Sequence, residues 1–575
     1  MLLLCSSVTP SNLGLWAITP RRKILCSCES QHHLTTLLVP VRFPTRNRIE
    51  FAIQREILFA IVPAVASGSG HQISRRTVLQ LMSAGAIGPL LASGSPKSKT
   101  RRSTLHMRAR LDVRSFGATG DGTTSDTNAI QSALEEASRQ GAVLTFPPGR
   151  YVSGTLHLRS NVSLVIAEGA TLVASPNDND FPVARPDYGD TVDELETVNA
   201  SFALLAGKNL SNLNISGRGT IDMNRSAYGG PKGIGLRECS DLVIESLTLR
   251  NAPDRNIELM GCNGVSISAV KILNGYSDGI DPDCCTNVSI SRCFVDSFDD
   301  SIVIKSSFAL GRRVDSSNIT VDSCHVRSSC NGLKIGTETE GDVTGVRFSN
   351  CLVSRRPSPG IPESLAEHGG VAIESVDGGH VSEVSVSDVV LEDIAGPLFV
   401  RLGNRGRAQA VPTPGTMSDI TFSNVSATGA SITASITGLP GYPVSNLTLS
   451  NVNLSYSRSV RVAPGLSVPE LAAAYPYVAM FGTLPSAGLY ARHVEDLNLS
   501  QVKLSQQTSD PRPGLVIDDG ESVSLDDLEL VGSRSPFIWL NDVRGGEVEF
   551  PVDSPLNPSN VRLTGGSAGV VFSRA

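Results

Sequence analysis

The chain has 575 residues, a formal net charge of -7 and only 5% aromatic residues, and it contains 53 glycines. The acidic balance argues against nucleic-acid binding, because neutralising phosphates requires a concentrated basic surface that the sequence lacks. No uninterrupted apolar run of about 20 residues, the length that crosses a bilayer, occurs in the body of the chain. Many short strands joined by polar turns suit this composition better than helices do.

The N-terminal residues precede the regular part of the sequence. The pair Arg75-Arg76 stands before a moderately apolar stretch that ends in small residues, which is typical of a twin-arginine export signal. We therefore expect residues 74–95 to direct export to the periplasm or the extracellular space, with an ordinary basic helix start as the alternative. Residues 1–73 are a poorly patterned extension, which predicts a mis-assigned start codon or, less well, an organellar transit segment. Residues 96–110 are predicted to be a linker.

An amphipathic helix is predicted where the regular sequence begins. The glycine-rich run Phe116–Gly122 leads into Thr127–Leu134, which has a polar start and apolar residues at helical spacing. The strand-like segment Val143–Phe146 follows. A helix ahead of strands is how a solenoid covers the exposed end of its core, so we predict an N-terminal cap. The glycines lack the Lys-Ser/Thr of a phosphate-binding loop, which argues against a nucleotide site.

From about residue 210 one short pattern recurs, in which a polar or glycine residue is followed by alternating apolar and polar residues. Alternation of this kind indicates strands with one buried face. Asn and Asp at the first position favour turns. Copies begin at Asn212, Asp241, Gly264, Asn287, Asn318, Gly345, Glu383, Asp419, Asn446, Asp496, Ser522 and Asn560.

The spacing between copies indicates the fold class. The first apolar residues Leu242, Val265 and Val288 are 23 residues apart, and the later intervals are 31, 27, 38, 36, 27, 50, 26 and 38. A core period in the low twenties with longer excursions is typical of stacked coils whose insertions emerge as loops. The sequence therefore predicts an all-β chain, a single-stranded right-handed parallel β-helix over residues 111–575. A β-sandwich would not keep this register.

Six of the 11 cysteines recur at fixed places in the repeat, while Cys5, Cys26 and Cys28 lie in the N-terminal extension. Equivalent residues of successive coils lie about 4.8 Å apart, and cysteine is a small hydrophobe that fills interior columns well. No Cys-x-x-Cys pair supports zinc, so we predict buried stacks and leave a disulfide between neighbouring coils open. The two sets are Cys239, Cys262 and Cys285, three residues before the first apolar position, and Cys293, Cys324 and Cys351, five residues after it.

Three aspartates fall at nearly equivalent places on two adjacent coils. Asp278 lies 13 residues past Val265, and Asp299 and Asp300 lie 11 and 12 residues past Val288. Carboxylates crowded on one face repel each other, which raises the pKa of at least one and can keep it protonated beside an ionised neighbour. Glycosidic hydrolysis requires this pair of states, an acid for the leaving oxygen and a base for water.

Two other hypotheses fit the same aspartates. Aspartate is common in turns, so the three residues could serve the coil geometry alone. A calcium site is the second alternative, to which Asp281 and Asp283 could contribute oxygen ligands.

The cap, the repeat, the segment Ser277–Pro282 and the segment Asp299–Lys305 together resemble glycoside hydrolase family 28, the polygalacturonases and rhamnogalacturonases. The resemblance covers most of the chain that follows the linker. It implies an inverting hydrolase that acts on a pectic polysaccharide or oligosaccharide without a metal or cofactor. It also implies that Asp299 is the general acid and that Asp278 and Asp300 hold and activate water.

The chain departs from this family pattern at two places. Polygalacturonases carry Gly-His-Gly one coil further on, where this chain has Cys330–Gly332 with Asn331 in place of the histidine. They carry Arg-Ile-Lys on the next coil, where this chain has Ala372–Glu374. The cationic pair that would bind a galacturonate carboxylate is therefore missing. A neutral sugar such as rhamnose would tolerate this loss, so we predict a rhamnogalacturonan-type linkage rather than plain polygalacturonan.

Charged and polar residues on or beside the later coils are predicted to bind substrate, with a structural role as the alternative for each. The interval between Leu447 and Leu497 carries Tyr475 and Phe481. A loop of that length is predicted to form a wall of the cleft, where aromatic rings suit sugar stacking. His493 is predicted to be structural. The predicted substrate-binding residues are Lys305, Asn331, Lys334, Glu374 and Arg401, with Arg405 and Glu338 as further candidates.

Two functions of other classes stay open at this point. A calcium-dependent pectate-type lyase would need the metal and would give unsaturated products. A carbohydrate-binding β-helix would bind the same sugars without turnover. The sequence gives no indication of the oligomeric state.

Overall fold

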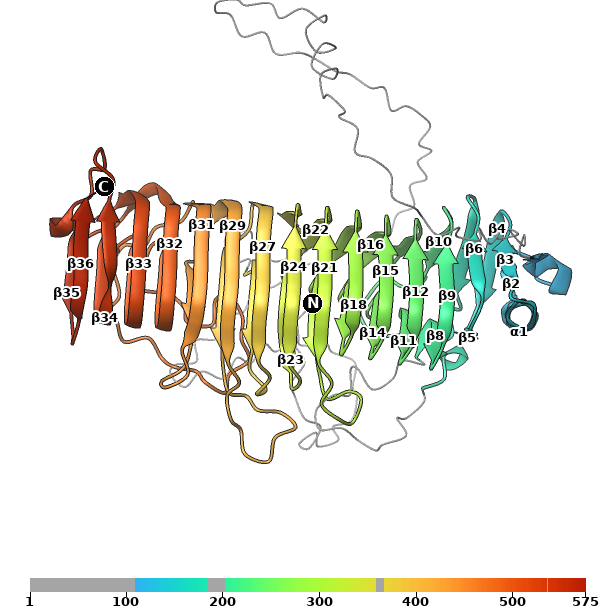
Figure 1. The fold of residues 1–575 in the computed structure, drawn as a ribbon. Coiled ribbons are helices and arrows are strands. Elements are labelled where there is room, and N and C mark those ends of the chain that lie inside the picture. Colours follow the sequence, from blue (N-terminus) through green and yellow to red (C-terminus); the bar gives the residue numbers. More distant parts are fainter. Residues whose placement is uncertain (1–108, 184–201, 358–366, 535, 575) are drawn as a thin grey trace, which may run out of the picture. The chain divides into compact units, whose positions relative to one another are not determined.

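The computed structural model describes residues 109–183, 202–357, 367–534 and 536–574. The predicted export signal and the extension before it lie outside these residues. The described part belongs to one compact unit, His106–Ala575, in which the named strands pair in parallel with their neighbours on successive coils. The predicted parallel β-helix is confirmed (Figure 1). No helix among the described residues is long and apolar enough to cross a bilayer.

Each coil contributes a strand to three parallel sheets. The first sheet contains β1 (Arg110–Asp112), β3 (Val143–Phe146), β6 (Ser163–Ile166), β9 (Ser211–Ser216), β12 (Ser240–Glu245), β15 (Asn263–Ser268), β18 (Thr286–Ser291), β21 (Ser316–Asp322), β24 (Val343–Ser349), β27 (Val381–Glu392), β29 (Met417–Ala430), β31 (Val444–Tyr456), β32 (Leu489–Asp510), β33 (Leu515–Ser533), β34 (Ile538–Phe550) and β36 (Ala568–Arg574).

The second sheet contains β2 (Asp121–Ser125), β4 (Gly149–Ser153), β7 (Ala170–Ala174), β10 (Thr220–Asp222), β13 (Thr248–Arg250), β16 (Lys271–Gly275), β19 (Phe294–Ser297), β22 (His325–Ser328) and β25 (Leu352–Arg355), and continues in the later parts of β27, β29 and β31. The third contains β5 (Leu156–His157), β8 (Ala203–Lys208), β11 (Lys232–Arg237), β14 (Ile257–Met260), β17 (Ile280–Asp283), β20 (Ile302–Ser306), β23 (Asn331–Thr339), β26 (Gly369–Ser375), β28 (Gly396–Leu402), β30 (Ala434–Thr437), the first parts of β32, β33 and β34, and β35 (Val561–Thr564).

The predicted N-terminal helix is present as α1 (Thr127–Gln140), which extends beyond the expected range. It lies at the β2 and β3 end of the stack (Figure 1). Its apolar face is buried through Ile130, Ala133, Leu134 and Ala137, so it covers the end of the core as a cap should. Short 3-10 helices occupy Val113–Phe116, Asp178–Asp180 and Pro558–Asn560.

The first residue of each repeat has a left-handed backbone conformation, which explains the preference for Asn, Asp and Gly there. Asn287 and Asn318 have φ values of 57° and 55°. The Asn318 Nδ2 donates to the Asn287 Oδ1 of the preceding coil at 2.6 Å. The side chains therefore form a ladder along the stack, and Val265, Val288 and Ile319 are in register beside it as predicted.

We expect Asn318→Val to destabilise the protein by about 1–2 kcal/mol, because a β-branched residue resists the left-handed conformation. Asn318→Gly keeps this conformation accessible and removes only the ladder hydrogen bond, so it should have the smaller effect. The free energy of unfolding from urea titration distinguishes the two variants. Equal losses would mean that the ladder, and not the backbone, selects asparagine here.

The predicted last copy is wrong. Val523 pairs with Gly546 in β34, which itself pairs with Val570 in β36. The strand that begins at Val561 pairs with Ile538 in the third sheet instead. The coil spacing therefore stays in the low twenties to the end of the stack. Glycine replaces the first apolar residue of this coil, which hid the repeat from the sequence pattern.

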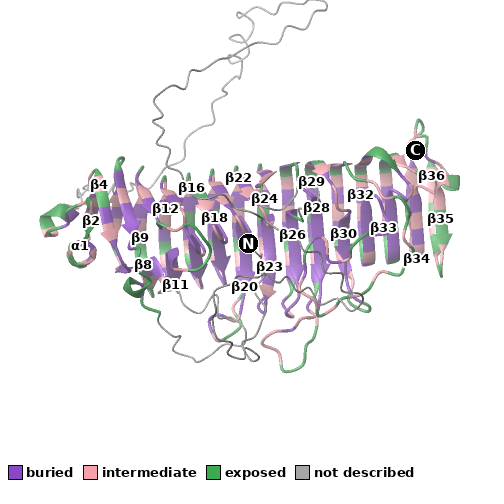
Figure 2. Ribbon diagram, turned by 180° about the vertical axis from the view of Figure 1, so that it is seen from behind, coloured by how far each residue is buried: buried purple, intermediate pink, exposed green. Residues whose placement is uncertain are grey.

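One continuous hydrophobic core runs through the coils, and both cysteine sets lie in it. Figure 2 shows the strands as predominantly buried along the stack. The Cys262 backbone N–H lies 3.3 Å from the Cys285 Sγ on the next coil, which is the contact expected of stacked interior residues. No disulfide links any of the eight cysteines in the described part of the chain.

Candidate active site

The three aspartates lie in the turns that join the second sheet to the third. Asp278 precedes β17, and Asp299 and Asp300 precede β20. The Gly279 N–H donates to the Asp300 carbonyl at 2.9 Å, and the Asn256 N–H donates to the Asp278 carbonyl at 3.0 Å. These ladder bonds continue the parallel sheet pattern through the turns, and they place the carboxylates on adjoining coils.

Asp299 is the carboxyl whose protonated form the site favours. The Asp300 backbone N–H lies 3.0 Å from the Asp299 Oδ1 and 3.2 Å from the Asp278 Oδ1, so the two carboxyls approach the same donor. Burial, together with the charges of Asp278 and Asp300, raises the pKa of Asp299 to about 7. Among the described residues Asp299 forms no ion pair.

Asp278 is held in the ionised form. Burial by itself would raise its pKa, but Lys305 and Arg255 outweigh that effect and hold the pKa below the usual value. The Lys305 Nζ donates to the Asp278 Oδ2 at 3.1 Å, and the Arg255 Nε lies 3.7 Å from the same oxygen. A carboxyl with a raised pKa and one with a lowered pKa therefore lie side by side.

Asp300 is bound by the next coil. The Asn331 Nδ2 donates to its Oδ1 at 2.8 Å, and the Lys334 Nζ donates to its Oδ2 at 3.0 Å. Lys334 also lies 3.6 Å from the Glu374 Oε2 and donates to the Thr337 Oγ1 at 3.3 Å. Burial raises the pKa of Glu374 to about 7, although Lys334 opposes the shift. Four of the predicted substrate-binding residues, Lys305, Asn331, Lys334 and Glu374, thus lie against the carboxylates or against a residue that binds one.

Sequence reasoning missed Arg255 and the structural role of Asp281. The Arg255 Nε donates to the Asp281 Oδ2 at 3.1 Å, and the Lys305 Nζ donates to the same oxygen at 3.1 Å. Arg255 is 23 residues before Asp278, the same interval that separates Leu242 from Val265. The coil period is therefore a sequence signal that places this arginine beside Asp278.

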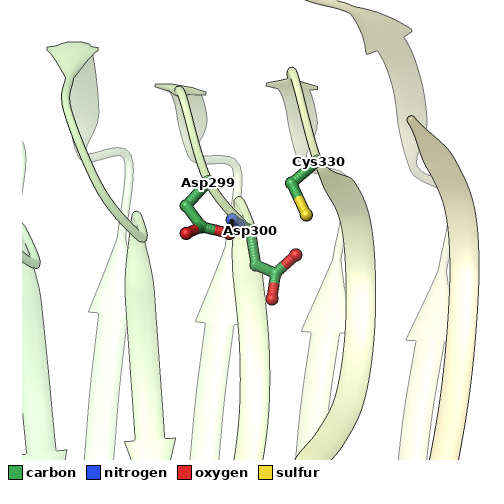
Figure 3. Close-up of side chains that lie close together, drawn as sticks. All are labelled: Asp299, Asp300 and Cys330. Atoms are coloured by element: carbon green, nitrogen blue, oxygen red, sulfur yellow. Dashed lines mark hydrogen bonds between the residues drawn. The ribbon is translucent and has the colours of Figure 1, made fainter. Parts of the chain in front are cut away.

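The geometry also bears on the calcium hypothesis. Within the described residues, the one group of potential metal ligands comprises Asp299, Asp300 and Cys330, whose ligand atoms lie within 4.8 Å of one another (Figure 3). Calcium prefers six to eight oxygen ligands, and a thiol is a poor substitute. The Asp283 carboxylate accepts from the Ser307 N–H at 2.8 Å, and Asp281 binds two cations. These contacts engage the two carboxylates that a calcium site was predicted to use.

Comparison with known proteins identifies the family. The model of the glycosyl hydrolases family 28 matches residues 188–467. The chain belongs to this family. It is a divergent member, because the identity to its relatives is low.

Two relatives of this family 28 hydrolase are polygalacturonases by name. A probable polygalacturonase of Vitis vinifera is 26% identical over 384 residues, which cover 61% of this chain and 75% of the relative. An endo-polygalacturonase of Pectobacterium carotovorum subsp. carotovorum is 25% identical and covers 47% of this chain and 78% of its own length. The solved exopolygalacturonase of Thermotoga maritima has a TM-score of 0.52 at 23% identity and covers 60% of this chain and 87% of its own. That likeness shows the fold.

The remaining candidates of the hydrolase lie further along the stack. The Arg401 Nη2 donates to the Glu470 carbonyl at 2.6 Å, and its Nη1 to the Gly438 carbonyl at 3.3 Å. Its guanidinium is therefore satisfied by backbone, and its substrate-binding role stays a prediction. The Arg405 Nε donates to the Asp377 Oδ1 at 2.9 Å.

Glu338 and His493 are also paired with protein groups. Glu338 lies between Lys305 and Arg407, at 3.9 and 3.3 Å. Burial opposes ionisation of Glu338, but Lys305 and the neighbouring arginines outweigh it and lower the pKa of this carboxyl. The His493 Nδ1 lies 2.6 Å from the Asp519 Oδ2, and its Nε2 lies 3.2 Å from the Glu470 Oε1. These contacts agree with a structural role for His493.

Proposed function

We propose that this family 28 hydrolase cleaves a glycosidic bond of a pectic polysaccharide with inversion, using Asp299 as the general acid. The observation that carries the proposal is the contrast between two neighbouring carboxyls. Asp299 has a pKa of about 7, whereas cations hold the pKa of Asp278 low. Inverting hydrolysis needs a protonated acid and an ionised base at the same pH.

The two steps of the reaction divide between these groups. Asp299 gives its proton to the glycosidic oxygen as the bond from that oxygen to the anomeric carbon breaks. Asp278 and Asp300 orient a water molecule, take one of its protons, and direct its oxygen to the anomeric carbon from the opposite face. Lys305 and Lys334 are positioning residues in this scheme, because they bind the two basic carboxylates and keep them ionised.

The substrate we propose is a rhamnogalacturonan-type linkage in preference to plain polygalacturonan. The cations next to the trio support this choice, since Lys305 and Lys334 already bind protein carboxylates. Glu374 adds a carboxyl where the family pattern has a cation. A neutral sugar would avoid placing a further carboxylate in this position. The names of the relatives point to polygalacturonan, so both polymers belong in the test.

We also propose that the hydrolase is exported, with residues 74–95 as the signal. Pectic polymers are too large to cross a membrane by themselves, which makes an exported enzyme the consistent arrangement. The test is the N-terminal sequence of the secreted protein.

Activity should have a bell-shaped dependence on pH. The acid form of Asp299 exists below its pKa of about 7 and is lost as the pH rises through that value, so kcat/KM should fall above pH 7. The base form of Asp278 is lost only below its lowered pKa, so the acidic limb should lie under the usual range of carboxyl groups. Initial rates measured at constant ionic strength give both limbs.

One experiment tests the proposed function as a whole. The protein is incubated with polygalacturonan and with rhamnogalacturonan, each with and without a calcium chelator, and product anomers are followed by NMR. We expect release of reducing sugar, inversion, no effect of the chelator, and faster turnover of rhamnogalacturonan. Unsaturated products would contradict the hydrolase mechanism, and faster turnover of polygalacturonan would contradict the proposed linkage alone.

A further inference from the structure

The segment between β31 and β32, residues 457–488, packs on the outer face of the third sheet; we call it the wall segment. Inward side chains of this sheet, such as Ile373 and Val400, belong to the main core. The outward side chains Ala372 and Phe399 form a separate cluster with Val478 and Met480 of the wall segment. The outer face just beyond Lys334 is therefore covered by protein.

The cover continues along the later coils. Leu484 packs with Tyr490 and Val516, which are fully buried outward residues of β32 and β33. The sheet strands β26, β28 and β30 that carry the first part of the cover stand next to one another in Figure 2. No continuous surface for a polymer is left on this side of the aspartates.

Hydrogen bonds hold the wall segment at several points. Arg401 binds the Glu470 carbonyl from β28, and the Arg492 Nη1 donates to the Val468 carbonyl at 2.7 Å from β32. The Asn404 N–H donates to the Ala472 carbonyl at 2.6 Å. These bonds tie the segment to coils on which it lies, so it is a built part of the surface.

The wall segment approaches the aspartates to within one coil. The Tyr475 hydroxyl lies 3.1 Å from the Thr337 Oγ1, and the Lys334 Nζ lies 5.9 Å from the centre of the Tyr475 ring. Lys334 binds Asp300 directly. Successive coils are roughly 4.8 Å apart, so a saccharide that extends from Asp300 in this direction meets the Tyr475 ring almost at once.

Two glycines allow the close approach of the wall segment. A Cβ at Gly396 would lie 2.8 Å from the Val478 Cβ, and one at Gly369 would lie 3.0 Å from the Val478 Cγ1. Gly369 itself lies against Asn331, where a Cβ would be 2.3 Å from the Oδ1. The sequence of contacts from Asp300 through Asn331 and Gly369 to Val478 is therefore tight, with no space for a passing polymer.

We propose that the hydrolase acts on a chain end, because the wall segment stops the polysaccharide on the Lys334 side of the scissile bond. The inference rests on the proposed function and adds the mode of action. An enzyme that cleaves within a polymer needs the chain to continue past the carboxylates on both sides. Here the substrate can continue only toward the earlier coils, and a short piece is released from the blocked side.

The test follows viscosity and reducing ends together on the polymer that the protein hydrolyses fastest. We expect one small saccharide from the first time points, with viscosity falling far behind the release of reducing ends. An early fall in viscosity with a ladder of oligosaccharides would overturn the inference and leave the proposed hydrolase intact. Absence of hydrolysis on every pectic polymer would overturn the proposed function, and the inference with it.

A matched pair of variants tests the wall segment itself. Val478→Asp places a charge in the contact with Phe399 and Gly396 and should loosen the segment, so that longer products appear. Val462→Asp is the control, since Val462 lies in the same segment with 79% of its surface exposed, and its products should match the wild type. If Val478→Asp fails to fold, Tyr475→Ala replaces it, with the same shift expected. Unchanged products from a folded variant would overturn the inference.

Discussion

Asp299→Asn should abolish turnover while leaving substrate affinity largely intact. The side chain keeps its shape, but an amide cannot give a proton to the leaving oxygen. Loss of a positioned general acid lowers rates by about 10²–10⁴-fold. Steady-state kinetics should therefore show a fall in kcat with little change in the Kd of a pectic oligosaccharide measured by calorimetry.

An exposed aspartate provides the control for this substitution. Asp553 lies at the surface of the last coils, and Asp553→Asn should match the wild type in kcat and in Kd. Unchanged turnover in Asp299→Asn would remove Asp299 from the mechanism. A loss of affinity as large as the loss of kcat would instead indicate a role in binding.

Lys334→Met should have the largest effect on stability. Its ammonium group is buried and pairs with Asp300 and Glu374 at 3.0 and 3.6 Å. Removing one partner of a buried ion pair leaves an uncompensated charge and costs about 3–5 kcal/mol. Urea titration near pH 7 measures the change in the free energy of unfolding.

The same variant should move the alkaline limb of the pH profile. Lys334 is among the charges that lower the pKa of Asp299, against burial and two neighbouring aspartates. Its loss should raise that pKa, so activity that remains should persist to higher pH. A limb at the wild-type position would show that Lys334 does not act on Asp299.

An exposed pair and a double variant complete the design. Lys503 and Glu529 lie 2.7 Å apart with 41% and 57% of their side chains exposed, so Lys503→Met should change stability by about 1 kcal/mol or less. Glu374→Gln removes one of the charges that Lys334 neutralises. The double variant Lys334→Met/Glu374→Gln should therefore be more stable than Lys334→Met alone. Additive losses would mean that Glu374 and Lys334 do not interact.

The fold of this chain could be predicted from sequence because its determinants are local and repeated. The 23-residue interval between Leu242 and Val265 and the left-handed residue ahead of each strand set the register coil by coil. The same interval placed Asp278 beside Asp299 and Asp300. Prediction failed where the pattern was locally erased, as at Gly546, whose missing side chain hid the last coil.

The ionisation of the site was decided by the tertiary structure. Which carboxyl remains protonated depends on the cations that reach it, and Arg255, Lys305 and Lys334 come from three different coils. Outward side chains of a parallel sheet are not constrained by the alternation that sets the core, so their partners cannot be read from the period.

The wall segment is the clearest case of a feature outside the reach of the repeat. Tyr475 contacts Thr337 across 138 residues of chain, and no local pattern connects them. The sequence by itself determined the β-helix, its cap and the meeting of three aspartates, because these follow from short-range periodicity. Only the tertiary structure decided which aspartate holds the proton and where the substrate surface ends, because both depend on packing between segments that are distant in sequence.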